Sequence, residues 1–425
     1  MNELPSRPAS GAPVAPIERL LAPLRRLLHV ESASGVVLLA CTALALAAAN
    51  SPLAASFAAF WHAPVALTLG PFTLAGDLGH LVVNDGLMAL FFFVVGLEIK
   101  RELAVGELRD PRKALLPVVA AVGGMVVPAA LFLLLQWGEP GQRGFAIPMA
   151  TDIAFVVGFL ALFGPRVPSG LKLFLLTLAI VDDLGAVVVI ALGYSGPLAL
   201  GWLAAAAAGL ALVVALQRLG VRAVAPYVAV GAFVWLATLR CGVHPTVAGV
   251  FLGLLTPARP SPAAGETEAP LVRLERALHP WVAFAIMPLF ALANAGVAFD
   301  GSALREPVAL AVVVGLFVGK PLGITLFSWL SVKSGATRLP AGVTWPMLIG
   351  GGCLAGIGFT MALFINGLAF PVAQFPQLEA AGKLGILIGS AASVLLGALL
   401  LALAFRAAAG RATAPSALPD AGGPA

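Results

Sequence analysis

The sequence predicts an all-α integral membrane protein of about twelve transmembrane helices, and three observations carry this prediction. Hydrophobic residues make up 60% of the chain and charged residues only 11%, whereas soluble domains are about a quarter charged. Apolar runs that approach the length of a membrane span follow one another too closely to leave room for a soluble domain. The basic side chains gather in alternate connections between these runs.

The predicted spans cover most of the chain. Those at 223–238 and 243–256 are shorter than the ~20 residues of a full span, so they are expected to be thin or steeply placed helices. The apolar runs lie at 33–49, 81–97, 114–135, 144–164, 171–193, 197–216, 223–238, 243–256, 280–298, 307–331, 344–370 and 382–405.

The distribution of lysine and arginine predicts that both termini face the cytoplasm. With the N-terminus inside, 20 of the 25 basic residues fall in cytoplasmic segments, as the positive-inside rule requires. Because these cations sit in short loops between apolar runs, the net charge of +5 does not indicate nucleic-acid binding. The exceptions are Lys320, inside a span, and four residues on the opposite face, Arg143, Arg240, Arg305 and Lys383.

The chain divides into three predicted regions, and the transmembrane region contains a predicted hairpin. Residues 1–30 are expected to form a cytoplasmic tail whose stretch 17–30 is an amphipathic helix on the membrane surface; 31–406 is the transmembrane transporter domain, and 407–425 a disordered cytoplasmic tail. Residues 64–75 alternate in hydrophobicity around Gly70-Pro71, which predicts a small β-hairpin on the outer face. A free hairpin edge can pair with a second copy, so a homodimer is expected.

The most informative residues are the ionisable ones inside the spans, where a charge costs at least about 2.5–3.5 kcal/mol. Asp182 and Asp183 lie at the middle of LKLFLLTLAIVDDLGAVVVIAL. Adjacent helical side chains point about 100° apart, so one carboxylate can face an aqueous cavity and the other a neighbouring helix. Burial and mutual repulsion both favour the protonated form. Such a pair can hold either protons or a small hard cation with oxygen ligands, such as sodium or lithium.

Two spans are predicted to be discontinuous. Pro148, Thr151 and Asp152 interrupt the run 144–164, and freed backbone groups are tolerated only beside a cavity or other protein. Gly356 and Gly358 belong to a glycine-rich run within 344–370; these glycines indicate either close helix packing or a second break. Two broken segments in corresponding halves of a chain indicate an ion site at mid-membrane.

Lys320 lies beside a proline in AVVVGLFVGKPLGITLF. A lysine at that depth needs a partner, and an aspartate of the 182–183 pair is the expected one. A faint repeat links the two halves. Lys172-Leu173 and Lys383-Leu384 open spans of opposite orientation, and ten residues after each lysine lie Asp182 and Ser393. This match predicts inverted-topology repeats.

From about residue 29 to 405 the sequence resembles the NhaA family of sodium/proton antiporters, itself one of the families from which the pattern of inverted repeats and broken helices is known. The resemblance implies that Asp182 and Asp183 bind the cation and protons, with Thr151 and Asp152 nearby. It also implies that the broken helices cross, that Asp152 and Lys320 balance their ends, and that Lys320 pairs with Asp182 when the cation is absent. The matching blocks are VNDGLMALFFFVVGLEIKRE, AIPMATDIAF, LAIVDDLGAV, GVHPTVAGV, LHPWVAFAIMPLFALANAGV, GKPLGI and GIGFTMALFI.

The family is activated by alkaline pH, and the resemblance implies a set of pH-response candidates. On the residues alone, the 98–102 cluster fits an ordinary positive-inside loop equally well. Arg276 stands where family members carry histidine, and arginine does not titrate near neutrality, so a shifted response is expected. Pro245 is expected to affect the placing of His244. The candidates are Glu98, Lys100, Arg101, Glu102, Glu275 and His279 on the cytoplasmic side, with His244 and Asp85 elsewhere.

The resulting hypothesis is a secondary antiporter of the bacterial inner membrane, not an enzyme. It exchanges cytoplasmic sodium or lithium for external protons by alternating access at a two-aspartate site, under pH regulation. Sodium or lithium ions, protons, membrane lipid and a second subunit paired through 64–75 are the expected partners, with no cofactor or nucleic acid.

Three alternatives remain at this stage. An intramembrane aspartyl protease also uses two membrane aspartates, but the contexts ATD and VDD differ from its motifs, and Lys320 has no role in its chemistry. A proton-coupled carrier of an organic solute would need more polar or aromatic residues lining its cavity. An ion channel would need a filter sequence, and none is evident.

Overall fold

The computed structural model describes residues 16–69, 72–221, 223–260, 268–299 and 301–413. Within these ranges, eight helices are long and apolar enough to cross a membrane, and three bent helix pairs bring the number of candidate spans to eleven. The short apolar helix α9 (Thr246–Leu255) accounts for the twelfth predicted segment. The predicted all-α membrane architecture is therefore confirmed.

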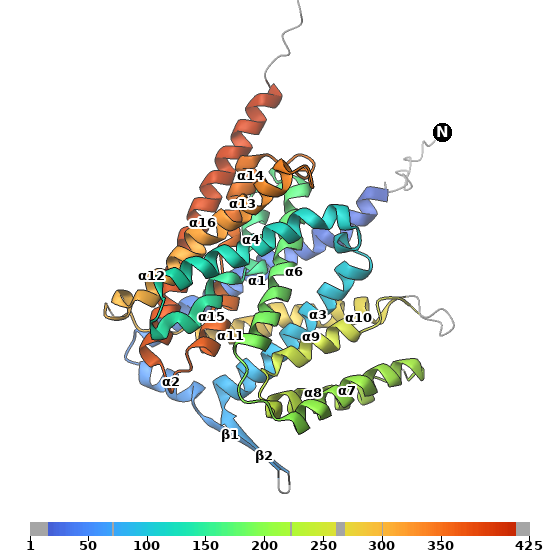
Figure 1. The fold of residues 1–425 in the computed structure, drawn as a ribbon, viewed down its shortest axis with the longest axis vertical. Helices are drawn as coiled ribbons and strands as arrows, with labels where there is room; N and C mark the ends of the chain where they lie inside the picture. The colour runs from blue at the N-terminus through green and yellow to red at the C-terminus, as the bar shows by residue number, and fades with distance from the viewer. Residues whose placement is uncertain (1–15, 70–71, 222, 261–267, 300, 414–425) are drawn as a thin grey trace, which may run out of the picture.

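The helices form one bundle, and the ends of the described chain lie opposite the hairpin (Figure 1). The continuous spans and bent pairs follow one another with short connections. In chain order the elements before the second half are α1 (Pro16–Ala49), α2 (Ala54–Trp61), η1 (Leu78–Leu87), α3 (Met88–Ala104), α4 (Pro111–Leu135), η3 (Pro140–Met149), α5 (Ile153–Leu162), α6 (Ser169–Gly193), α7 (Leu200–Arg218), α8 (Val224–Cys241) and α9.

The later elements repeat the arrangement of a broken helix between two longer spans. The first break lies between α4 and α6, and the second lies between α13 and α16. These elements are α10 (Pro270–Trp281), η6 (Val282–Ile286), α11 (Met287–Asn294), α12 (Pro307–Val314), η8 (Gly315–Gly319), α13 (Lys320–Lys333), α14 (Trp345–Ala355), α15 (Phe359–Ala369) and α16 (Pro376–Thr413).

Two predicted boundaries differ from the structure. The segment 17–30 is helical, but α1 continues from it without a break into the first span. The tail expected from residue 407 begins inside α16, which continues to Thr413 because its alanine-rich sequence favours helix. Residues 1–15 and 414–425 lie outside the described part of the chain.

The predicted hairpin is present at the end of the molecule away from the chain ends (Figure 1). Strands β1 (Pro64–Leu69) and β2 (Phe72–Asp77) are antiparallel, with Leu67 opposite Leu74 and Leu69 opposite Phe72. The sheet contains only these two strands within the described residues, so both edges of the hairpin lack a strand partner there.

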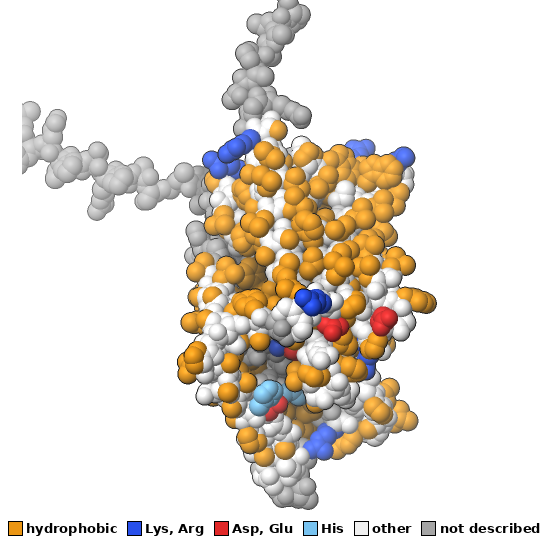
Figure 2. Space-filling model, turned by 90° about the vertical axis from the view of Figure 1, so that its left-hand side faces the viewer, with side chains coloured by type: hydrophobic (Ala, Val, Ile, Leu, Met, Phe, Trp, Pro, Cys, Tyr) orange, Lys and Arg blue, Asp and Glu red, His pale blue; other side chains and the backbone are white. Residues whose placement is uncertain are grey.

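The surface of the bundle is suited to a hydrocarbon solvent. Figure 2 shows one face covered mainly by hydrophobic side chains, with lysine and arginine side chains at its upper end and a hollow in its lower half where histidine and acidic side chains meet. Leu192 on α6 and Leu162 on α5 have side chains that are 82% and 78% exposed. Apolar side chains are stable in such positions when they face lipid.

Small residues set the closest helix contacts. A Cβ added to Gly96 of α3 would lie 2.6 Å from the carbonyl oxygen of Val250 on α9, and one added to Gly323 of α13 would lie 2.1 Å from that of Gly123 on α4. Backbones approach this closely only where a side chain is absent. The pairs α3–α9 and α4–α13 are therefore packed backbone against backbone.

A π-helical turn precedes Lys320. Pro321 has no backbone N–H for the carbonyl of Phe317, and the turn η8 widens at this point before α13 begins at Lys320. Prolines and π turns disturb the hydrogen-bond ladder of a helix, so the chain is irregular where it places its one buried lysine among the described residues.

Candidate ion-binding site

The two broken helices meet at their breaks. The helices η3 and α5 are bent by 43°, and α14 and α15 by 45°. The backbone N–H of Asp152 in the first break donates to the carbonyl of Ile357 in the second, at 2.7 Å. A Cβ added to Gly356 would lie 2.5 Å from the carbonyl oxygen of Leu316, so the second break requires glycine there for space. Gly358 begins α15 as its N-cap.

The carboxylate of Asp152 caps the N-termini of the two helices that follow the breaks, α5 and α15. Its Oδ1 accepts a hydrogen bond from the backbone N–H of Phe155 in α5 at 3.3 Å. Its Oδ2 accepts from the backbone N–H of Thr360 in α15 at 3.1 Å and from the Thr360 hydroxyl. The side chain is buried. One carboxylate thus satisfies unpaired N–H groups at two helix N-termini, where negative charge is favourable.

We expect Asp152→Ala to lower the apparent melting temperature of the purified protein, because each lost cap costs about 0.5–2 kcal/mol. Asp110→Ala is the matched control, since Asp110 caps only α4 through the backbone N–H of Arg112 and lies on the surface. A larger loss for Asp152 than for Asp110, with Asp152→Asn between, is the expected order. Equal melting temperatures for all variants would contradict the double cap.

Asp182 is bound by the first break and by Lys320. Its Oδ2 accepts from Lys320 Nζ at 2.6 Å, and both side chains have no exposed surface. Lys320 also donates to the carbonyl of Met149 at the end of η3. Thr151 Oγ1 lies 2.8 Å from Asp182 Oδ2 and 2.9 Å from the carbonyl oxygen of Ala355, and its single proton serves one acceptor at a time.

Asp183 instead lines a cavity, while Asp182 lies outside the lining. The cavity also contacts Thr151 and Asp152. Within the described chain, Oδ1 of Asp182 and Oδ1 of Asp183 are buried without a hydrogen-bond partner. Buried carboxylate oxygens without partners are costly, and they are suited to a proton or a small cation with oxygen ligands.

The far end of the cavity carries a charged cluster. Glu98, Arg101, Glu102 and His279 all line it. Arg101 forms an ion pair with Glu275, and its guanidinium lies 3.7 Å from Glu102. His279 Nδ1 lies 3.8 Å from Glu98 Oε1. These contacts join α3 to α10.

Two neighbouring basic residues lie apart from this cavity. Lys100 is half-buried and outside the lining. Arg276, where the sequence departs from the resembled family, forms an ion pair with Glu268 on the exposed surface. Its guanidinium is therefore engaged outside the charged cluster.

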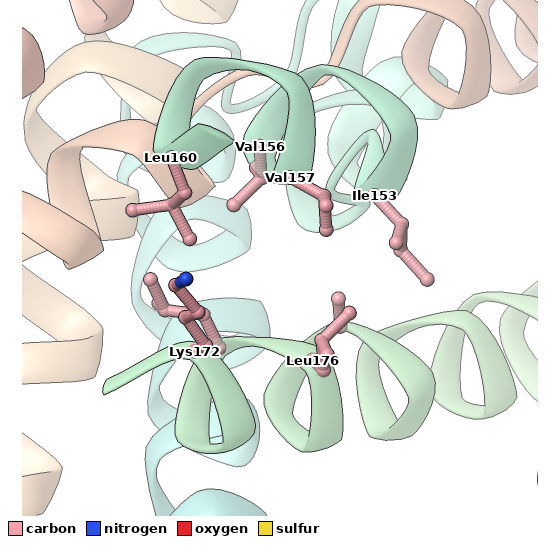
Figure 3. A pocket seen from close by; sticks show the side chains of 8 residues that line it. Ile153, Val156, Val157, Leu160, Lys172 and Leu176 are labelled. Atoms are coloured by element: carbon pink, nitrogen blue, oxygen red, sulfur yellow. The ribbon is translucent and has the colours of Figure 1, made fainter. Parts of the chain in front are cut away.

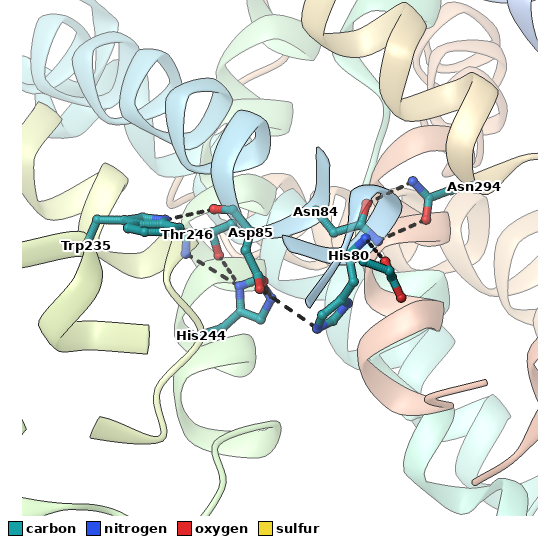
Figure 4. A network of polar contacts seen from close by, with 8 residues as sticks. His80, Asn84, Asp85, Trp235, His244, Thr246 and Asn294 are labelled. Carbon is teal, nitrogen blue, oxygen red and sulfur yellow. Dashed lines mark hydrogen bonds and ion pairs between the residues drawn. The ribbon is translucent and has the colours of Figure 1, made fainter. Parts of the chain in front are cut away.

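Asp85 and His244 belong to a separate network near the hairpin end (Figure 4). His244 Nε2 lies 3.3 Å from Asp85 Oδ1, and His80 Nε2 lies 3.8 Å from Asp85 Oδ2. The indole of Trp235 donates to the Asp85 carbonyl at 2.9 Å. The sequence-predicted pH-response candidates therefore lie at two ends of the molecule.

A second, smaller cavity lies between α5 and α6 (Figure 3). Its lining is apolar apart from Lys172. A cation has no oxygen ligand from these side chains. It shares Ile153 and Leu176 with the larger cavity. The complete lining consists of Ile153, Val156, Val157, Leu160, Lys172, Leu175, Leu176 and Ala179.

Comparison with known proteins identifies the family. The sequence profile described as Na+/H+ antiporter 1 matches residues 25–401 of the chain. The chain belongs to this antiporter family.

Relatives in the family match the chain over nearly its whole length. The Na(+)/H(+) antiporter NhaA of Rhodopirellula baltica is 50% identical, over 94% of this chain and 98% of the relative. Na(+)/H(+) antiporter NhaA 2 of Acidiphilium cryptum is 47% identical over 93% and 95%, and the NhaA of Rhizobium meliloti 45% identical over 93% and 97%. Among solved structures, the sodium proton antiporter MjNhaP1 of Methanocaldococcus jannaschii shows a TM-score of 0.46 at 15% identity, over 90% of this chain and 98% of that one.

Membership of the Na+/H+ antiporter family makes the protein a secondary transporter and not an enzyme, so the intramembrane protease alternative is excluded. Sequence reasoning missed Thr360, which hydrogen-bonds to Asp152 by both its backbone and its side chain. The available signal was its place directly after the second break, comparable to Thr151 at the first. The pair Asn84 and Asn294 was also missed, because no local motif links residues 210 positions apart.

Proposed function

We propose that this Na+/H+ antiporter exchanges cytoplasmic sodium or lithium for external protons by alternating access at Asp182 and Asp183. One observation carries the proposal: the aspartates lie where two broken helices cross. Asp183 lines the cavity there, and Asp182 forms an ion pair with Lys320. A cation arriving through the cavity meets carboxylate oxygens, the Thr151 hydroxyl and the carbonyls of the breaks, which suit sodium and lithium.

Competition for the same oxygens couples the two ions. Protons on the aspartates leave when a cation binds, and a cation leaves when protons return. In the cation-bound form, Asp182 shares its charge with the ion and Lys320 is released from it. The occupied forms, protonated or cation-bound, favour reorientation between the two faces of the membrane. The form whose carboxylates hold neither a proton nor a cation does not favour reorientation. Exchange then needs no separate coupling device.

The proposed orientation places the charged cluster on the cytoplasmic side of a bacterial inner membrane. The excess of basic residues on that side supports cytoplasmic termini. The β1–β2 hairpin then lies outside, and its free edges support a homodimer formed by strand pairing. Lipid covers the apolar faces of the bundle.

The charged cluster supports pH regulation at the cytoplasmic mouth. An imidazole changes charge within the physiological pH range, and His279 faces Glu98 on α3, with Arg101, Glu102 and Glu275 beside them. Protonated His279 would donate a hydrogen bond from Nδ1 to Glu98 across the mouth at low pH, and an imidazole that has lost this proton would release Glu98. Loss of the His279 proton as the pH rises would therefore activate exchange at alkaline pH.

We expect opposite effects from two substitutions of His279. His279→Arg keeps a positive charge at every pH and should move the pH of half-maximal exchange upward. His279→Gln is always neutral and should move it downward, so that exchange persists at lower pH. Exchange rates in everted vesicles over a pH series measure both shifts, and His62→Gln at the outer end is the control. Shifts in the same direction would contradict the proposed switch.

The function is tested in inside-out vesicles acidified by respiration and loaded with a pH-sensitive dye. Sodium or lithium chloride should cause proton release that grows as the pH rises above neutral, and potassium chloride should not. Vesicles without the protein show the background. Absence of proton release at every pH, from protein shown to be folded, would overturn the exchange. Proton movement that depends on an organic solute would instead indicate a proton-coupled carrier of that solute.

A further inference from the structure

The large cavity lies beside a cluster of buried aromatic rings. On three elements its lining residues include Phe91 of α3, Met287 of α11 and Thr360 of α15. The next residue or turn on each element carries a phenylalanine that is outside the lining and at most 3% exposed. These phenylalanines are Phe92, Phe290 and Phe364.

Phe364 is the centre of this cluster. Its ring centroid lies 5.5 Å from that of Phe92 and 6.2 Å from that of Phe290. The His244 ring meets it edge-on at 5.2 Å. Phe92, Phe290 and His244 contact one ring from three separate elements and form a cage around it. We call this four-ring cluster the aromatic plug.

A network of polar side chains adjoins the plug through His244, with Asn84 two helical turns before Phe92 and Asn294 one turn after Phe290 (Figure 4). Asn84 and Asn294 exchange two amide hydrogen bonds of 3.1 and 2.9 Å. Asn294 also donates to the carbonyl of Phe290 at 2.9 Å. His244 lies at ion-pair distance from Asp85, which also faces the mostly exposed His80. The plug therefore separates the inner cavity from polar groups that approach the outer surface.

The cage and the ring at its centre belong to different parts of the fold. The Asn84–Asn294 and Asp85–His244 contacts tie the walls of the cage to the single segment η1–α3. Phe364 lies on α15, four residues after Thr360, which is bonded to Asp152 in the other break. A movement of the broken helices relative to η1–α3 therefore carries Phe364 out of its cage.

We propose that Phe364 is the outer gate of the transport path, closed when its ring fills the cage. The inference rests on the proposed alternating access. A dry apolar constriction blocks ions because hydrated ions do not enter it, and bare charges are costly in apolar surroundings. The inner cavity reaches Asp183 while the plug is closed, so loss of the plug would open the site to both sides at once.

The first test measures leakage in proteoliposomes. Phe364→Ala should raise passive sodium-22 efflux, without a proton gradient, roughly tenfold or more over the wild type. Phe364→Leu should give an intermediate leak. The matched control is Phe370→Ala, which removes a fully buried phenylalanine from the end of the same helix outside the plug and should stay sealed. Sealed vesicles containing folded Phe364→Ala protein, or equal leakage from the control, would overturn the gate.

A second test does not depend on the alanine variant folding. Cys41, Cys241 and Cys353 are the native cysteines, and their replacement by alanine gives a background for Phe92→Cys with Phe364→Cys. A short thiol-reactive cross-linker, itself cleavable by reduction, should stop exchange in this pair, and reduction should restore it. Full exchange by cross-linked protein would overturn the gate. Absence of exchange in the wild type would instead overturn the proposed function, since the leak measurement does not require exchange.

Discussion

Asp183→Asn is expected to abolish sodium-dependent proton release while the protein remains folded. The substitution keeps the size of the side chain but removes both the proton that is exchanged and the negative charge that holds the cation. Asp183 lines the cavity and has a buried oxygen without a hydrogen-bond partner in the described chain. No native contact that the structure shows is lost with its charge, so stability should change little.

The measurement is exchange in everted vesicles at equal amounts of protein, with the melting temperature of each variant as a check of folding. Asp110→Asn removes a surface carboxylate outside the cavity and should retain wild-type exchange. Asp182→Asn should also abolish exchange. Retained exchange at the wild-type rate in either aspartate variant would remove that residue from the proposed site.

Lys320→Ala is expected to have the second largest effect, on stability. The substitution leaves Asp182 fully buried without its cation partner, and breaking a buried pair on one side costs about 3–5 kcal/mol. Protonation of Asp182 relieves part of this cost, because a neutral carboxyl is easier to bury. The loss should therefore be small at low pH and grow as the pH rises.

A double substitution separates the pair from other effects of the lysine. Asp182→Asn combined with Lys320→Met removes both charges and should recover much of the lost stability at neutral pH. Melting temperatures of the wild type, both single variants and the double variant complete the cycle. Additive losses would show that Lys320 stabilises the fold through something other than Asp182.

Much of the architecture could be predicted because each long apolar run has few alternatives in a membrane. All twelve predicted segments coincide with helices or bent pairs, and the hairpin lies where alternation and Gly70-Pro71 indicate it. The continuation of α1 through residues 17–30 was not predicted. An amphipathic pattern shows which side of a helix is apolar, but not whether the helix bends at its end.

Part of the candidate site could be predicted from the sequence because charged residues within membrane spans are rare. The faint repeat that pairs Asp182 with Ser393 also has a counterpart in space. A Cβ added to Gly356 in the second break would lie 2.7 Å from Ser393 Oγ, as Asp182 lies against Thr151 in the first. Long-range partners such as Thr360 with Asp152, or the cage around Phe364, depend on the crossing of helices and leave no local pattern.

The shared carboxylate of Asp152 also has a mechanical consequence. Its Oδ1 accepts a hydrogen bond from the N-terminal turn of α5, and its Oδ2 accepts one from the N-terminal turn of α15. A tilt of one half-helix alone would stretch or break these bonds in a buried place where water cannot replace them. The two half-helices therefore act as a single lever whose pivot is one side chain. Any sliding of the two half-helices is therefore expected where α5 packs against α1 and α15 packs against α11 and α16, and not at the crossing itself.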